Sequence, residues 1–364
     1  MSPTLSQIWF NIQENLFPYM QEEVGPLTPK ILQVIQTLEL VRMEDYIGTC
    51  FGYVGRPKES RKAIARAFVS KSILNIPTTT MLIERLQIDK SLRRICGFDS
   101  LGDVPSESTF SRAFKEFSDR GLPSFVHEAL ILATKSTQLI GHVSRDSTII
   151  EAREKPKVKE KAKKKKESKK RGRPKKGETR PKKELTVLER QQSMTYNELM
   201  TSFSTGCDVG CKRNSKGNTE VWIGYKLHLD VIDGDIPVSS LLSSASVHDS
   251  QVAIPLAEVT HRRITNCYDL MDSAYDSPII RDHSRSLGHI EIIDHNPRRG
   301  EKIQFDPAKK VRYNQRSSAE RVNGRLKDEF GGRYVRVKGP AKVLAHLMFG
   351  VLALTADQLL RLVS

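Results

Sequence analysis

The chain has 364 residues, long enough for an enzymatic core together with a smaller domain. Its five cysteines are few and scattered, and its longest apolar run, 343–356, falls short of the ~20 residues that span a bilayer. Because the N-terminus also lacks a basic start followed by an apolar run, these features argue against a secreted or membrane protein and favour reduced thiols in a cytoplasm.

Residues 1–135 have the pattern of a helical domain. Ser106 precedes a segment in which apolar residues recur at helical spacing, and 74–92 is a second helical stretch with Pro77 near its start. The apolar face after Ser106 consists of Phe110, Ala113, Phe114 and Phe117. This patterning indicates packing and does not by itself show what the domain binds.

Residues 139–151 are predicted to form the first strand of a second domain, 136–364. Asp146 has the same parity as Ile140, Thr148 and Ile150, so a carboxylate shares a face with apolar side chains.

A basic, low-complexity segment, 153–184, interrupts this second domain. It holds 18 Lys or Arg and 5 Glu, a net charge of +13 out of the +16 of the whole chain. Because it has almost no apolar residues, we expect a disordered insertion between the first and second core strands. Within it, Arg171-Gly172-Arg173-Pro174 resembles an AT-hook, whose arginines enter the narrow minor groove of A·T-rich DNA. The alternative is nonspecific attraction to any polyanion through counterion release.

Regular structure is expected to resume at Val221. Alternating apolar residues predict a strand from there to Val231, followed by a turn about Gly234 and a returning strand over 237–244. The remaining predicted elements are a helix over 250–259, strands over 268–271 and 290–293, a helix over 313–330 and a last helix over 338–362. This order of strands and helices indicates an α/β fold.

One face of the predicted helix 313–330 carries a distinctive set of groups. Tyr313, Arg316, Glu320 and Lys327 share a narrow stripe at about 100° per residue, so one face combines a phenol, a carboxylate and two cations. Such a face suits a metal ion and a phosphate backbone together. Gly324 on the same stripe would let a bulky polymer approach closely. The opposite side can be buried against a core through Ala319, Val322, Leu326 and Phe330.

The spacing Tyr313-x2-Arg316-x3-Glu320-x6-Lys327 matches without a gap the signature of bacterial insertion-sequence transposases, the IS-four and IS-five superfamily of DDE enzymes. Further blocks resemble this family from about residue 50 to the C-terminus. Arg-Asp146-Ser-Thr-Ile-Ile resembles its first catalytic strand, and Leu-Met-Asp272-Ser-Ala-Tyr resembles the strand end with the second aspartate. Blocks that begin at Gly224 and at Ala245 lie between them, and several blocks in the right order are a specific signal.

The resemblance implies a ribonuclease-H-like catalytic core, with a mixed sheet and flanking helices, over 136–364. It implies that the helical domain, 1–135, helps to recognise the ends of the element; a scaffold without DNA contact is the alternative. The implied activity is a cut-and-paste DNA transposase, which cleaves at the element ends and transfers the exposed 3′-hydroxyl to target DNA. A catalytically inactive DNA-binding derivative and a nuclease without strand transfer are the competing hypotheses.

The resemblance also assigns roles to single residues. Asp146, Asp272 and Glu320 would hold two Mg²⁺ ions, with Mn²⁺ as a substitute, at the reacting phosphate. Tyr313, Arg316 and Lys327 would contact the DNA end, since cations on phosphates set the register of a bound duplex. The implied partners are the terminal inverted repeats, the target DNA and a second copy of the chain in the paired-end complex. The implied location is the bacterial cytoplasm, at the nucleoid when DNA is bound.

Three smaller features have simpler interpretations. Asp249 is expected to cap the helix that follows it, while His248 could point into the site. Asp276 is expected to cap its own local turn. Cys207-x3-Cys211 raises the question of zinc, which usually needs four ligands in close pairs, and no second pair is evident.

Overall fold

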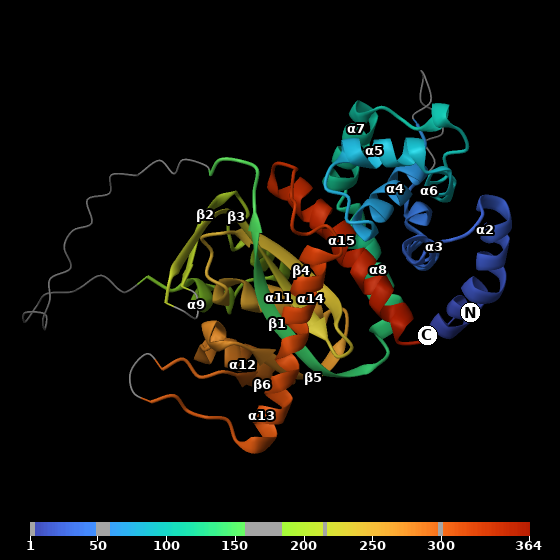
Figure 1. Ribbon diagram of the computed structural model, residues 1–364. Coiled ribbons are helices and arrows are strands. Elements are labelled where there is room, and N and C mark those ends of the chain that lie inside the picture. Colours follow the sequence, from blue (N-terminus) through green and yellow to red (C-terminus); the bar gives the residue numbers. More distant parts are fainter. Residues whose placement is uncertain (1–3, 49–58, 157–183, 214–216, 298–300) are drawn as a thin grey trace, which may run out of the picture.

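A computed structural model describes residues 4–48, 59–156, 184–213, 217–297 and 301–364. Most of the basic segment, including Arg171 and Arg173 of the AT-hook-like core, lies outside the described residues. In Figure 1 a helical N-terminal part lies beside a sheet that is flanked by helices, and the C-terminal helix α15 runs between the two.

The N-terminal part is helical, as predicted. Its elements are α1 (Leu5–Asn11), η1 (Ile12–Leu16), α2 (Phe17–Val24), α3 (Pro29–Val41), η2 (Met43–Tyr46), α4 (Arg61–Ile73), α5 (Thr79–Ile88), α6 (Lys90–Cys96), η3 (Leu101–Asp103), α7 (Glu107–Asp119) and α8 (Leu122–Lys135). The helix predicted after Ser106 is confirmed as α7, and its four predicted apolar residues are buried.

The helical stretch predicted over 74–92 is confirmed in part: α5 and α6 cover most of it, but its first residues are not helical and the two helices are separated at Asp89. The helix α4 ends at Ile73, and Asn75 follows in the left-handed region with φ 52°. Pro77 then disfavours helical backbone in the residue before it, so α5 starts only after the Thr78 cap.

Within the described residues the sheet has six strands. They are β1 (Leu139–Glu151), β2 (Asp208–Arg213), β3 (Thr219–Ile232), β4 (Ile236–Ser244), β5 (Thr265–Met271) and β6 (Ile290–Ile293). The order is β2-β3-β1-β5-β6, with β4 paired to β3. β1 is antiparallel to β3 and parallel to β5, and β5 is parallel to β6. The predicted first strand, turn and returning strand are therefore confirmed.

At Gly224 the backbone of β3 leaves no room for a side chain beside the end of β1. The φ of this glycine is 153°, and a Cβ at this position would lie 2.1 Å from the carbonyl oxygen of Ile150. Only glycine fits this backbone contact, which fixes β3 against the end of β1.

The helices of the second part are α9 (Val187–Gln191), α10 (Tyr196–Thr201), α11 (Ser250–His261), η4 (Ser273–Tyr275), α12 (Pro278–Ser286), α13 (Pro307–Tyr313), η5 (Asn314–Arg316), α14 (Ser317–Asp328) and α15 (Pro340–Arg361). Regular structure thus resumes at Val187, with two short helices and β2, and not at Val221 as predicted. The two helices start with Thr-x-x-Glu capping boxes, a signal that apolar alternation does not detect.

The helix predicted over 313–330 is interrupted. Tyr313 ends α13, a 3₁₀ turn follows, and α14 begins at Ser317. The carbonyl of Gln315 accepts a hydrogen bond from the Ser144 hydroxyl on β1 at 3.2 Å, and the Ser317 hydroxyl donates to the carbonyl of Asn314. These side-chain contacts compete with the regular helical hydrogen bonds and bring the turn onto β1.

The helix α15 forms the centre of the core. It contacts α3, α4, α7 and α8 on the helical side, and β4 and α14 on the sheet side. It is long and apolar enough to cross a membrane by length and composition alone, but 83% of its most apolar window is buried. A core helix has the same properties, and the last helix predicted from the sequence, over 338–362, is confirmed.

Candidate active site

Two aspartates come together at the centre of the sheet. Asp146 lies in β1, and Asp272 directly follows β5, the parallel neighbour of β1. In the strand register Arg145 pairs with Met271, so the next residue of each strand is one of the two aspartates. Burial raises the pKa of Asp146 to about 6, and the nearby charge of Asp272 adds to the effect.

Asp272 also has a local structural role. Its Oδ1 accepts the backbone N–H of Ala274 at 2.9 Å and so caps the turn η4. Burial nevertheless raises the pKa of Asp272, with the Arg316 guanidinium opposing the shift. The capping contact accounts for the place of this aspartate at a strand end, but not for its closeness to Asp146.

The helix α14 and the 3₁₀ turn η5 before it lie against β1 and face Asp146 at two points. The Nδ2 of Asn323 donates to Asp146 Oδ2 at 3.1 Å, and Nη1 of Arg316 lies 4.0 Å from Asp146 Oδ1. Glu320 is four residues after Arg316 and three before Asn323, so it starts from the same face of the helix. Its carboxylate pairs with the Arg316 guanidinium, and its side chain is 57% exposed.

The carboxylate of Glu320 is therefore not joined to the two aspartates. Across the described ranges, no group of three or more His, Cys, Asp or Glu side chains is placed to hold a metal ion. The physical reason is electrostatic: three carboxylates repel one another, and Arg316 acts as the positive charge between Asp146 and Glu320.

The groups around Asp146 match the requirements of a hard divalent cation. Each candidate ligand offers oxygen, which Mg²⁺ prefers. The Oδ1 of Asn323, buried beside Asp146, has no hydrogen-bond partner among the described residues. Raised pKa values at both aspartates show that their negative charges are poorly compensated. The sequence reasoning missed Asn323, although it lies three residues after Glu320 and thus on the same helical face.

The other two signature residues lie on either side of Glu320. Tyr313 packs its ring on Phe305, with centroids 4.8 Å apart, and the Arg316 guanidinium lies 5.8 Å from the tyrosine ring. Burial raises the pKa of Tyr313. Lys327 is half-buried at the other end of α14, where burial lowers its pKa and Glu151 opposes the shift. Gly324 has open space beside it.

The expected cap by Asp249 is wrong. Asp249 makes no side-chain hydrogen bond to the helix α11; instead its Oδ1 accepts from Lys226 Nζ at 2.9 Å. The Nδ1 of His248 accepts the Ser250 N–H at 3.3 Å and takes the local role. The negative charge of Asp249 also helps to raise the pKa of Asp272, so this ion pair borders the two aspartates. The sequence gives no local signal for the contact between Lys226 and Asp249, because the pairing of β3 with β4 brings them together.

The remaining sequence candidates have structural contacts. The expected local cap by Asp276 is wrong: its carboxylate accepts from Arg281 Nη2 at 2.8 Å and from the backbone N–H of Asn296 at 2.9 Å. Cys207 is buried whereas Cys211 is exposed, so the two thiols have different environments.

Two parts of the chain match models of known protein families. Residues 201–356 match the transposase DDE domain, and residues 25–116 match a transposase domain named DUF772. Together the matches support a DDE transposase, a class of enzyme that acts on DNA. The first match includes Asp272 and Glu320 and begins after Asp146. No curated protein and no solved structure matches the chain significantly.

Proposed function

We propose that this chain is the transposase of a bacterial insertion sequence of the IS-four and IS-five superfamily, with a ribonuclease-H-like core. The observation that carries the proposal is the placement of Asp146 in β1 and of Asp272 at the end of its parallel neighbour β5, beside Arg316 of η5 and the face of α14 that bears Glu320. The strand arrangement supports it: β1, β3 and β4 are antiparallel neighbours, and β5 and β6 continue the sheet parallel to β1.

The chemistry needs charge neutralisation at a phosphate more than covalent help from the protein. Asp146, Asp272 and Glu320 would hold two divalent ions, which when bound neutralise the entering and leaving oxygens. For Glu320 to join the aspartates, its carboxylate must leave Arg316. The guanidinium would then be free to bind a phosphate of the DNA end, so the same rearrangement prepares both the metal site and the DNA contact.

Both chemical steps are phosphoryl transfers. A water molecule attacks the phosphodiester at the element end and releases a 3′-hydroxyl; that hydroxyl then attacks a target phosphodiester, forms a new bond and releases a target 3′-hydroxyl. Since two ends must be joined to one target, we propose a homodimer in the paired-end complex. The helices of 1–135 would contribute to recognition of the terminal inverted repeats.

The test is cleavage of DNA that carries the ends found beside the gene, in the presence of Mg²⁺. Asp146→Ala, Asp272→Ala and Glu320→Ala should each lower nicking by at least about 10²-fold while DNA binding persists. Asp282→Ala, at an exposed carboxylate on α12, is the matched control and should nick normally.

The outcomes separate the hypotheses. Joined products indicate a transposase, whereas nicks without joining indicate a nuclease. Binding without any nicking by the unaltered protein would indicate an inactive derivative. Near-normal nicking by Glu320→Ala would show that Glu320 is not one of the catalytic carboxylates.

Arg316 and Lys327 are proposed to hold the DNA end. Replacing both with Ala should weaken binding of end DNA and reduce the slope of log affinity against log salt by roughly 0.9 for each phosphate that is no longer neutralised. Affinity measured over a series of salt concentrations gives this slope, and an unchanged slope would contradict the role.

The basic segment is proposed to act as a DNA tether that is dispensable for chemistry. Its net charge of +13 supports this role, and Arg171 and Arg173 would favour A·T-rich minor grooves. Replacing 157–183 with a short Gly-Ser bridge should give a folded protein with weaker, less salt-sensitive DNA affinity, while nicking of pre-bound ends survives. Undiminished affinity after the deletion would refute the tether.

A further inference from the structure

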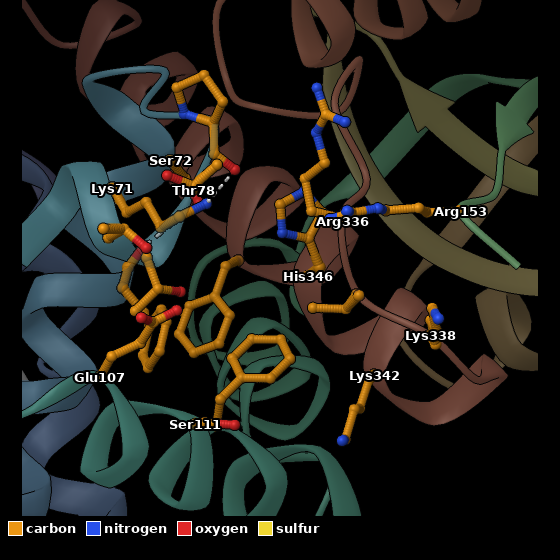
Figure 2. Close-up of a pocket in the computed structure, with 17 residues that line it drawn as sticks. Lys71, Ser72, Thr78, Glu107, Ser111, Arg153, Arg336, Lys338, Lys342 and His346 are labelled. Atoms are coloured by element: carbon orange, nitrogen blue, oxygen red, sulfur yellow. Dashed lines mark hydrogen bonds between the residues drawn. The ribbon is translucent and has the colours of Figure 1, made fainter.

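A cavity of about 480 Å³ lies away from the two aspartates, between the helical part and the segment that leads into α15. Figure 2 shows its two sides: Lys71 and Glu107 come from the helical part, and Arg153, Arg336, Lys338 and Lys342 line the other side. Its size falls in the roughly 300–1,000 Å³ range of ligand pockets.

The lining of this cavity has a strong excess of positive charge. Among the described residues that line it are five cations, those of Lys71, Arg153, Arg336, Lys338 and Lys342, and one carboxylate, that of Glu107. Throughout the described ranges, no ion pair is found for any of the five. Unpaired cations that converge on one hollow repel one another, so the site favours an anion.

Lys71 gives the clearest indication of a missing counter-charge. Its side chain is buried, and among the residues that the structure describes its ammonium donates only to the carbonyl oxygen of Pro77, at 3.3 Å. Burial lowers its pKa to about 8. A buried ammonium without a carboxylate is costly, and an anion in the cavity would supply the missing partner.

Helix N-termini add to the positive potential. Thr78 and Thr79 lie at the start of α5, Glu107 begins α7, and Lys338 and Lys342 flank the start of α15. The N-terminal ends of helices carry partial positive charge and favour phosphate. At α15 the Gly339 N–H already donates to the Glu154 carboxylate, so the other two helices and the side chains carry this effect.

We propose that this cavity binds a phosphate of the DNA backbone, as an anchor separate from the catalytic carboxylates. Arg153 follows the end of β1 by two residues, and Arg336 lies on the segment between α14 and α15. The charge of Glu151, the last residue of β1, acts on Lys327, so a DNA strand held by Lys327 would lie near the end of β1 that leads to Arg153. This proposal rests on the proposed function only where it names DNA as the source of the phosphate.

The exposure of the lining favours a polymer over a small ion. Arg153, Arg336 and Lys338 are exposed, whereas Lys71 is buried. A backbone that enters past the exposed cations can place one phosphate near Lys71 and others outside it. A single inorganic phosphate would leave most of the five charges uncompensated.

The main test is DNA affinity in EDTA, where no cleavage occurs. Arg336→Gln combined with Lys342→Gln should lower the affinity for a fluorescent duplex carrying the element end by about tenfold, and lower the salt slope by roughly 1 to 2. Lys62→Gln combined with Lys90→Gln is the control of equal charge change: both lysines are exposed on α4 and α6 of the helical part, outside the cavity lining. The control should change affinity less than about twofold.

Glu107→Gln tests the same site in the opposite direction. Removing the one carboxylate of the lining should tighten DNA binding about two- to fivefold, the range for loss of one exposed charge interaction. A misfolded protein would not bind DNA more tightly. The gain in Glu107→Gln therefore tests the site even if the Arg336/Lys342 variant is unstable.

Inorganic phosphate provides the remaining arm. If millimolar phosphate stabilises the unaltered protein against heat but not the Arg336/Lys342 variant, while both bind DNA equally, the cavity holds a free anion and the DNA anchor is refuted. Equal losses of DNA affinity in the cavity variant and in the control would also refute the anchor, because they would show that the cations attract DNA only diffusely. If the unaltered protein never nicks DNA but the Arg336/Lys342 variant still binds DNA more weakly, the proposed catalysis is refuted and the DNA anchor is supported.

Discussion

Two neighbouring residues of β1, Arg145 and Asp146, differ in how well their charges are compensated by hydrogen bonds and opposite charges. Arg145 is 2% exposed and makes a bidentate pair with Asp230, at 2.8 Å from Nε and 2.6 Å from Nη2. The hydroxyl of Thr260 donates to the same carboxylate at 2.5 Å. On the next residue, Asp146, the carboxylate has the amide of Asn323 as a close donor and a raised pKa.

The two residues therefore have different roles on one strand: Arg145 stabilises the sheet, and Asp146 is available to bind a cation. The pair of Arg145 and Asp230 joins β1 to β3 with its hydrogen-bonding groups largely satisfied, as buried ions require. Asp146 lies near a second carboxylate, with Arg316 only at the edge of contact. A poorly compensated charge is what a cation-binding site needs before the cation arrives.

Breaking the satisfied pair should have the largest effect. Arg145→Met leaves the Asp230 carboxylate buried without its cation, and should lower the free energy of unfolding by about 3–5 kcal/mol. The urea midpoint compared with that of the unaltered protein measures this.

Arg145→Met combined with Asp230→Leu is the control, because it removes both charges and should recover most of the loss. A single variant that costs less than about 1 kcal/mol would show that the pair does not stabilise the sheet.

Neutralising Asp146 should have the opposite sign. Its pKa is raised from 3.8 to about 6, so the folded protein holds the proton more tightly than the unfolded chain. The contribution of this group to stability is therefore greatest below about pH 4 and falls as the pH rises through 6. In EDTA at pH 7, Asp146→Asn should gain up to about 3 kcal/mol, and the gain should fall to about 0.5 kcal/mol at pH 4.

Urea unfolding at the two pH values measures this gain. Asp282→Asn, at an exposed carboxylate, should be neutral at both. A loss of stability at pH 7 in the Asp146 variant would show that its carboxylate is well compensated after all.

Much of this site can be predicted from local sequence patterns. The strand predicted over 139–151 has the same limits in the structure, because alternation defines it and 153–184 bounds it. The positions of Asp146 and Asp272, within one strand and at the end of another, follow from the same patterns. That the two strands are neighbours came from the family resemblance, since pairing between distant segments has no local signal.

The features that sequence reasoning missed depend on tertiary contacts. The break before α14 follows from Ser144, whose hydroxyl binds a backbone carbonyl 171 residues away. Lys226 meets Asp249 only after β3, β4 and α11 have assembled. The anion cavity likewise combines residues from four helices and from the segments that connect distant elements.

The smallest expected effect on stability is at Asn323, which links α14 to Asp146. Asn323→Leu removes the donor to Asp146 and also an oxygen that is buried without a partner, so the two effects on the free energy of unfolding should cancel to within about 1 kcal/mol. Catalysis should respond more. Loss of a donor disfavours the carboxylate, raises the pKa of Asp146 further and moves the rising limb of the pH profile for end cleavage to higher pH. Asn314→Leu, at an exposed amide on η5, is the control and should leave the profile in place. If both variants give the same profile, Asn323 serves packing alone and the contrast between the two faces of β1 does not extend to α14.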